Sequence, residues 1–246
     1  MHNSDLKNNA KKALTGTYWM AFLLSLIFSI IVGACNTIIS TIQYAGVDYR
    51  KAIEYAAEGK LEKAQAMLQQ DDPVVSMVVS LLSIAIAVFL TNILQVGHNK
   101  AYIHNRYNKE IKIELLFEPF KHYFNTMKTM FFRDLYVALW SLLFVIPGIV
   151  KSYSYYMIPY IIAENPNIST SRAFEISKKT MYGEKGKAFY MHLSFIGWYL
   201  LSLLTCGIGA YFLTPYTQAT FTEFYEYTKS KAISTGIASP DEFEAA

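Results

Sequence analysis

Charged residues are scarce in this chain of 246 residues, because Asp, Glu, Lys and Arg together make up only 17% of it. An average soluble domain contains about 25%. The net charge is only +3, and the basic residues are spread over several segments without forming a stripe interleaved with aromatic residues. This distribution argues against nucleic acid as a partner.

Cysteine is also nearly absent. Cys35 and Cys206 are too few for a disulfide framework or a cysteine-rich zinc site. The two thiols either pair with each other or remain free and buried, and we expect the free form. The five histidines form no His-Glu-x-x-His pair, so the sequence predicts no metal site.

The common motifs of enzymes are missing as well. Residues 183–188, Gly-Glu-Lys-Gly-Lys-Ala, lack both the first glycine and the closing Ser or Thr of a phosphate-binding loop. The sequence contains no recognisable pairing of a nucleophile with a base. We therefore predict that the protein is not an enzyme and that it uses no cofactor.

Long uncharged runs are what the sequence has in abundance. A helix of about 20 apolar residues crosses the hydrocarbon of a bilayer, and each long run reaches this length. The sequence therefore predicts an all-α integral membrane protein. The long runs cover 13–47, 73–99 and 188–222, and two shorter ones, 135–150 and 152–163, flank Lys151.

The first run permits a second interpretation. Three lysines precede an apolar stretch containing Val32-Gly-Ala-Cys35, which is similar to the processing box of a bacterial lipoprotein. The apolar core of a signal peptide is usually about 7–15 residues long. Here it extends from Tyr18 past Cys35 to Ile42, so we favour an uncleaved first transmembrane helix.

An internal similarity organises the later runs. Trp140, several leucines, Gly148-Ile149 and Pro159-Tyr160 are echoed by Trp198, further leucines, Gly207-Ile208 and Pro215-Tyr216. If this is a repeat, each copy is a helical hairpin that turns at its Gly-Ile. Repeats in the same direction are known in membrane proteins. The alternative is that residues 135–163 form one kinked span.

Two hairpins give six segments and a defined orientation. Seventeen of the twenty-two Lys and Arg residues then lie on one side, which the positive-inside rule makes cytoplasmic. We predict a multi-pass protein of the bacterial cytoplasmic membrane, with both termini inside. A single domain, 1–231, contains spans at about 18–42, 74–97, 130–150, 152–164, 188–205 and 209–227 and a water-exposed helical loop, 48–72, and is followed by a flexible polar tail, 232–246.

Two groups of residues are candidates for sites. Basic amphipathic helices near the N-terminus and over 169–182 are expected to contact anionic phospholipid. Four residues around the second short run are expected to form a polar site within the membrane or, for the lysine, to anchor the tip of the hairpin. The candidate lipid contacts are Lys7, Lys11, Lys12, Arg172, Lys178 and Lys179; the candidate polar site is Lys151, Tyr153, Tyr156 and Tyr160.

The stretch from Leu139 to Pro166 resembles the signature of a bacterial integral membrane family known only as a domain of unknown function. Its first part, residues 139–149, reads Leu-Trp-Ser-Leu-Leu-Phe-Val-Ile-Pro-Gly-Ile. Residues 4–16, 193–198, 207–209, 213–216 and 224–225 are also similar to that family. A more distant likeness connects the proline-glycine break and the following helix to the membrane domain beside glycerophosphodiester phosphodiesterases. The resemblance implies a lipid or envelope setting and supplies no catalytic residues.

The sequence thus predicts a non-enzymatic envelope protein that binds lipid, partner proteins or a second copy of itself. The alternative is a small transporter or channel subunit, for which the repeated proline-broken hairpins argue.

Overall fold

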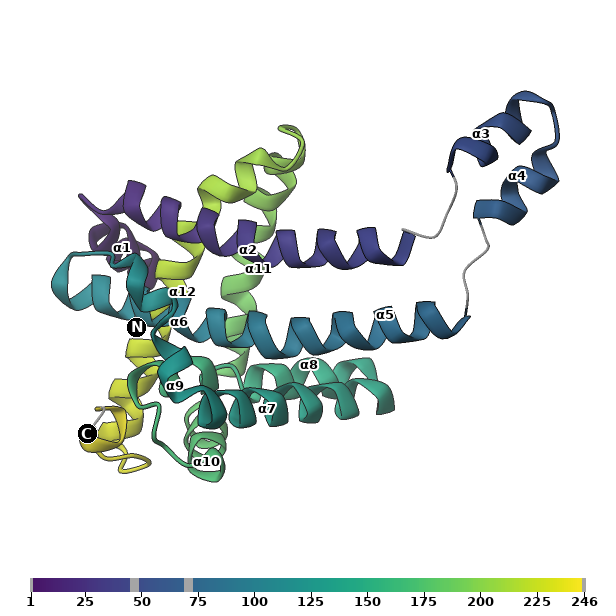
Figure 1. Cartoon of the computed structure of the whole chain (residues 1–246). Helices are drawn as coiled ribbons and strands as arrows, with labels where there is room; N and C mark the ends of the chain where they lie inside the picture. The colour runs from purple at the N-terminus through teal and green to yellow at the C-terminus, as the bar shows by residue number, and fades with distance from the viewer. Residues whose placement is uncertain (1, 45–48, 69–72, 245–246) are drawn as a thin grey trace. The chain divides into compact units, whose positions relative to one another are not determined.

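A computed structural model describes residues 2–44, 49–68 and 73–244, and within these ranges the chain forms helices joined by turns and short loops, with no strand. The predicted all-α class is confirmed, and Figure 1 shows the helices in chain order. The helices are α1 Asn3–Leu14, α2 Tyr18–Tyr44, α3 Tyr49–Ala57, α4 Leu61–Leu68, α5 Pro73–Ile86, η1 Ala87–Thr91, α6 Asn92–Asn108, η2 Ile113–Leu116, η3 Glu118–His122, α7 Tyr123–Leu143, α8 Val145–Ser154, α9 Ile158–Glu164, α10 Thr170–Thr180, α11 Lys185–Leu203, α12 Ile208–Ser234 and η4 Pro240–Phe243.

The chain divides into two compact units, where the sequence predicted one domain. The first unit combines Met1–Ser29 with Thr91–Ala246, and the second is Ile30–Leu90. Within the second unit the predicted loop helix is two helices, α3 and α4, because Gly59 has a left-handed φ of +76° and ends the helical path. Residues 45–48 and 69–72 lie outside the described ranges.

A helix that crosses a bilayer alone must be both long and apolar. Among the described residues, no helix alone is long and apolar enough to cross one. One bent pair, Asn3–Leu14 with Tyr18–Ala34 at 97°, reaches the requirement when its two helices are taken together.

The first predicted hairpin exists, but it turns at Phe144, where α7 ends and α8 begins. The prediction that it turns at Gly148-Ile149, with Lys151 at its tip, is wrong. The ring of Pro147 would clash with the carbonyl of Leu143 if α7 continued, so the helix stops there. Gly148 has a different role: a Cβ at this position would lie 2.8 Å from Ser141 Cα, so glycine allows α7 and α8 to pack closely.

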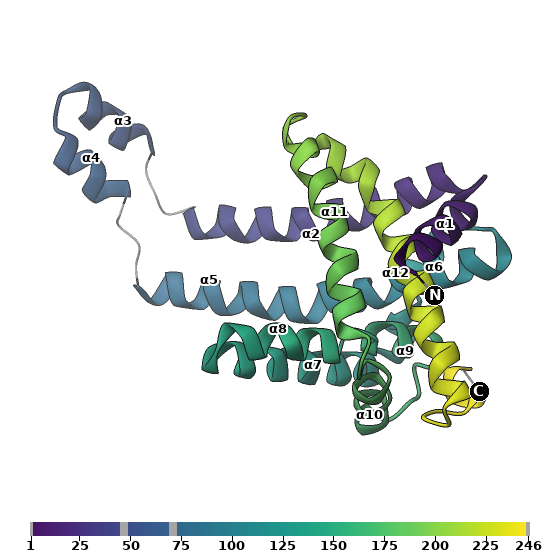
Figure 2. The same ribbon diagram turned by 180° about the vertical axis from the view of Figure 1, so that it is seen from behind.

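The second hairpin turns at its Gly-Ile, as predicted. Gly207, with φ +85°, precedes α12. A Cβ on Gly209 would lie 2.9 Å from Ser202 Cβ. In both hairpins, therefore, a glycine packs against the serine seven positions earlier in the chain. The prolines differ, because Pro159 lies in the first turn of α9 whereas Pro215 lies inside the continuous α12. Figures 1 and 2 show the two hairpin tips pointing in different directions.

The core of the first unit lies where α1, α6, α9 and α12 pack together. The amphipathic helix predicted near the N-terminus is confirmed as α1, which buries one apolar face: Leu6, Ala10, Ala13 and Leu14. On α6, Gly97 is required by the approach of the η2 segment, since a Cβ there would be 2.1 Å from the carbonyl oxygen of Leu116. We call this part of the unit, together with α10 and residues 235–244, the packed end.

Composition predicted a flexible polar tail over 232–246, but the described part of this segment, 232–244, is folded. Residues 235–244 fold back on the packed end, where Ala238 and Phe243 are 4% and 3% exposed. A short 3-10 helix, η4, follows Ser239, whose side chain and backbone form a capping box with Glu242. Buried apolar side chains and a satisfied helix start therefore hold the segment in place.

Candidate functional site

Helices α7 and α10 form the two walls of an open groove of about 940 Å³. Each wall is a stripe of residues spaced four apart, so that its members share one helical face. A hydrogen bond of 2.8 Å joins the Thr129 and Thr170 hydroxyls and fixes one helix against the other. The first stripe is Lys128, Phe132 and Tyr136, and the second is Thr170, Phe174 and Lys178.

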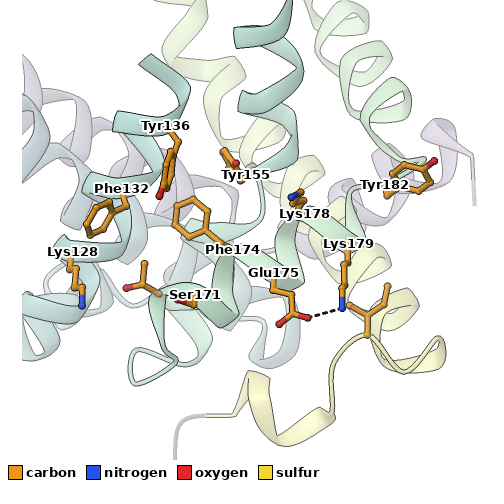
Figure 3. Close-up of a pocket in the computed structure, with 12 residues that line it drawn as sticks. Lys128, Phe132, Tyr136, Tyr155, Ser171, Phe174, Glu175, Lys178, Lys179 and Tyr182 are labelled. Atoms are coloured by element: carbon orange, nitrogen blue, oxygen red, sulfur yellow. Dashed lines mark hydrogen bonds and ion pairs between the residues drawn. The ribbon is translucent and has the colours of Figure 1, made fainter. Parts of the chain in front are cut away.

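Aromatic rings form the middle of the groove, and Figure 3 shows them between the two lysine ends. Phe174 lies edge-on to Tyr155, with ring centroids 4.9 Å apart, and to Tyr136 at 5.6 Å. Tyr155 comes from the end of α8, so the first hairpin contributes the third side. The groove therefore combines an apolar aromatic surface with a cation at either end.

The lysines of the groove differ in their partners. Lys179 Nζ lies 2.6 Å from Glu175 and is paired. Lys128 and Lys178 are exposed, and within the described residues neither forms an ion pair, because the groove carboxylate of Glu175 pairs with Lys179 and Arg172. These two ammonium groups are therefore available to an anion entering the groove.

Arg172, predicted to contact lipid, holds the C-terminal segment through its hydrogen bonds. Its guanidinium donates to Glu242 at 2.6 and 3.0 Å, to the carbonyl of Ile237 at 2.8 Å and to Glu175 at 2.8 Å. The hydrogen bonds from Arg172 hold the pKa of Glu242 at about 2. With four hydrogen bonds made inside the protein, Arg172 belongs to the packing of this end.

The predicted lysines of α1 are not part of the groove. Lys7 Nζ lies 4.3 Å from the centre of the Phe195 ring, and Lys11 Nζ lies 5.7 Å from that of Tyr216. Both are cation–π contacts to the second hairpin. Lys12 lines a separate small hollow beside Arg106. The six predicted contacts therefore fall at different places, and only Lys178 and Lys179 reach the groove.

A second candidate site is a polar cavity of about 390 Å³ between α6, α7, α9 and α12. Arg133, 16% exposed, donates to Asp134 at 2.7 and 2.9 Å. The same guanidinium donates to Asn92 at 3.1 Å and to Gln95 at 3.3 Å. Asn92 in turn donates to the other oxygen of Asp134. The network is therefore closed and carries no net charge.

Two of the predicted polar residues line this cavity and two do not. Tyr156 and Tyr160 face it, beside Gln218. Tyr153 instead packs on His192, with its hydroxyl 3.3 Å from Nδ1. Lys151 lies inside α8 with its Nζ 4.6 Å from the centre of the Trp140 ring, so it packs across the hairpin and neither lies at the tip nor contributes to the cavity.

Sequence reasoning missed most members of both sites, although a signal was present. Three amides of α6 recur at helical spacing within or beside a predicted apolar span: Asn92, Gln95 and Asn99. Polar groups on one face of such a span mark a shared polar interior. Lys128, Phe132 and Tyr136 have a regular spacing of four that likewise predicts a common face.

Cys206 is a free, exposed thiol in the second hairpin turn, with φ +51°. The prediction of a buried thiol is therefore wrong at this position. The side chain of Cys35 lies outside the described residues.

The comparisons with known proteins give one match. Residues 143–232 match the model of a family described as a protein of unknown function (DUF975). This agrees with the resemblance to a family of unknown function over the hairpin region, but the matched range does not include residues 4–16. No curated protein and no solved structure matches the chain. Neither the membrane setting nor the likeness to the phosphodiesterase-associated domain follows from the match.

Proposed function

We propose that this is a multi-pass protein of the bacterial cytoplasmic membrane whose two hairpin tips lie in hydrocarbon. The support is the exposure of apolar side chains. At the α7–α8 turn, the residues from Leu142 to Ile146 are between 64% and 83% exposed. At the other turn, Leu203 and Leu204 are 68% and 83% exposed. Contiguous apolar surface of this kind is rare on soluble monomers and is typical of membrane contact.

The charges support the same orientation. The packed end contains the ion pairs Arg106–Glu223 and Lys229–Glu164, whereas neither turn carries a charged residue. Figure 1 shows the N and C labels beside the packed end. Although the hairpins diverge, both tips enter the same membrane if its normal lies between their axes. The packed end is then at the cytoplasmic surface.

In this setting the α7–α10 groove binds an anionic phospholipid, which is the function that the geometry supports best. The single observation that carries this proposal is the pair of unpaired lysines at the ends of an aromatic groove. Lys128 precedes the span predicted to begin at about 130, so the groove lies at headgroup level. There, ammonium groups attract lipid phosphate and aromatic rings contact the upper acyl chain.

The test is retention of phosphatidylglycerol by the detergent-purified protein, measured by native mass spectrometry. We expect the double variant Lys128→Gln/Lys178→Gln to lose most of the bound phosphatidylglycerol and to retain phosphatidylcholine at the original low level. The control, Lys121→Gln/Lys187→Gln, removes the same charge at two positions that do not line the groove and should leave retention unchanged. Equal retention by both double variants would refute a specific site.

A second arm distinguishes a lipid from free phosphate as the source of the anion. Inorganic phosphate at millimolar concentration should not displace phosphatidylglycerol, because it makes no contact with Phe132 or Phe174. Complete displacement would mean that the groove binds phosphate alone.

A further inference from the structure

Three lysines from different helices lie close together at one end of the α7–α10 groove. Lys178 of α10 lines the groove there, and Figure 3 shows it on the far side of the aromatic rings from Lys128. Lys185 is the first residue of α11, and Lys151 belongs to the last turns of α8. We call Lys151, Lys178 and Lys185 the lysine corner.

Contacts beside the lysine corner hold its three helices together. The Ser177 hydroxyl donates to the carbonyl of Ser154 at 2.9 Å and so joins α10 to α8. Tyr153 lies edge-on to Phe189, with ring centroids 6.2 Å apart, and so joins α8 to α11. Each member of the lysine corner lies within about one helical turn of one of these contacts. The packing of the helices therefore brings the lysines together.

The charges of the lysine corner act on one another. Burial lowers the pKa of Lys185 below its ordinary value, and the ammonium groups of Lys151 and Lys178 lower it further. A like charge opposes protonation of its neighbour only when the two groups are near each other. The corner is therefore a local concentration of positive charge.

The nearby acidic side chains do not neutralise this charge. The carboxylate of Glu175 is shared by Lys179 and Arg172. That of Glu184, which precedes α11, is taken by two lysines outside the corner. Within the described part of the chain, no member of the lysine corner forms an ion pair. An anion that enters this end of the groove therefore meets three ammonium groups that lack a counter-charge.

A phosphate monoester suits the lysine corner better than the phosphate diester of most phospholipids. A monoester carries about −1.5 to −2 charges at pH 7 and presents three strong acceptor oxygens, whereas a diester carries a single charge. The more highly charged group offsets more of the repulsion among the three ammonium groups. We propose that the groove prefers a lipid with a terminal phosphate monoester, such as phosphatidic acid, with its phosphate at the lysine corner and its acyl chains along the aromatic rings. This inference rests on the proposed function of the groove.

Competition between two lipids tests the preference. The detergent-purified full chain is mixed with equimolar phosphatidic acid and phosphatidylglycerol of the same acyl chains, and the bound lipids are counted by native mass spectrometry. We expect the wild type to bind severalfold more phosphatidic acid. Lys151→Gln/Lys185→Gln should bind the two lipids in about equal amounts, and Lys151→Arg/Lys185→Arg, which keeps the charge, should retain the preference.

The matched control removes the same charge elsewhere. Lys112→Gln/Lys121→Gln changes two exposed lysines outside the groove lining and the lysine corner, so it should keep the wild-type preference. Equal binding of the two lipids by the wild type would overturn the inference, as would an equal loss of preference in both glutamine double variants. Because Lys151 also packs on Trp140, the single variant Lys185→Gln provides a second test that leaves that contact intact, and it should lower the preference as well.

Failure of this inference can be told apart from failure of the proposed function. If the wild type binds both lipids equally and Lys128→Gln/Lys178→Gln loses both, the groove binds anionic lipid and only the preference is wrong. If that double variant keeps both lipids, the proposed function is wrong as well. Glycerol 3-phosphate, a free phosphate monoester, should not displace phosphatidic acid at millimolar concentration, because it makes no contact with the aromatic rings. Complete displacement would overturn the assignment of a lipid as the ligand.

Discussion

The packed end and the tips of the two hairpins differ in which side chains they bury. At the packed end, charged side chains are buried in pairs, and Glu164, Glu223 and Glu226 have side chains only 9%, 5% and 7% exposed. At the hairpin tips, apolar side chains are exposed, and Phe144 is 70% exposed. The difference indicates that the two regions meet different surroundings, and each of the following predictions is designed to break or sharpen that contrast.

The largest expected loss of stability follows from breaking a buried ion pair of the packed end. Lys229 Nζ lies 2.6 Å from Glu164, which also accepts a hydrogen bond from Tyr225. Glu164→Leu leaves the ammonium group unpaired, so we expect a loss of about 3–5 kcal/mol in the free energy of unfolding. Denaturant titration in detergent measures it. Glu175→Gln, which breaks the exposed pair with Lys179, should have a much smaller effect, and equal losses would contradict the distinction.

The next largest effect is expected at two glycines, one in each region. Alanine at these positions should change the free energy of unfolding in opposite directions. Gly97→Ala should destabilise the protein by about 1–3 kcal/mol, because the new methyl group meets the Leu116 carbonyl. Gly197→Ala, in α11 with nothing within 4 Å of its Cβ, should stabilise by about 0.5–1 kcal/mol through helix propensity. Thermal unfolding of both variants in one detergent tests the pair. A loss at both positions would mean that α11 packs against an unrecognised surface.

The hairpin tips should tolerate polar substitution without loss of fold. Phe144→Ser should change the free energy of unfolding in detergent by no more than about 0.5 kcal/mol, because the side chain contacts little of the protein. The same variant should weaken vesicle association, because the ring no longer contributes to apolar transfer. Flotation of the variant with liposomes measures the second quantity. A folded variant with undiminished flotation would argue against insertion of this tip.

The smallest effect is the pH dependence of the C-terminal segment. Arg172 holds the pKa of Glu242 at about 2, below its ordinary value of 4.5. The resulting stabilisation is present above the ordinary value and is lost as the pH falls from about 4.5 towards 2. We expect the melting temperature to decrease over that interval in the wild type and less steeply in Glu242→Gln. Parallel curves would show that another carboxylate controls the acid transition.

These contrasts also show what could be predicted from the sequence. The amphipathic helices near the N-terminus and over 169–182 followed from helical spacing alone, and both are present as α1 and α10. The sequence prediction places the first turn at Gly148, but the structure has it at Phe144. The difference arises because a proline disrupts the helix at the carbonyl four positions earlier, which for Pro147 is Leu143. Local pattern therefore predicted both hairpins and the turn of the second one, but it misplaced the turn of the first.

The candidate sites were less predictable, because their residues come together only in the tertiary structure. The Arg133–Asp134 network needs amides from α6, and Gln218 comes from α12, so no local window contains the set. Lys151 was singled out because it interrupts an uncharged run, yet it packs on Trp140. A lysine within an apolar segment therefore indicated a helix–helix contact in this chain.

The central claim is that the hairpin tips lie in hydrocarbon while the packed end lies in water. Spin labels at Phe144→Cys and Lys178→Cys, each in a background free of native cysteines and reconstituted in liposomes, test it directly. The account predicts that the label at 144 collides mainly with oxygen and hardly with a water-soluble nickel chelate, and that the label at 178 shows the reverse. High nickel accessibility at both positions would contradict the account.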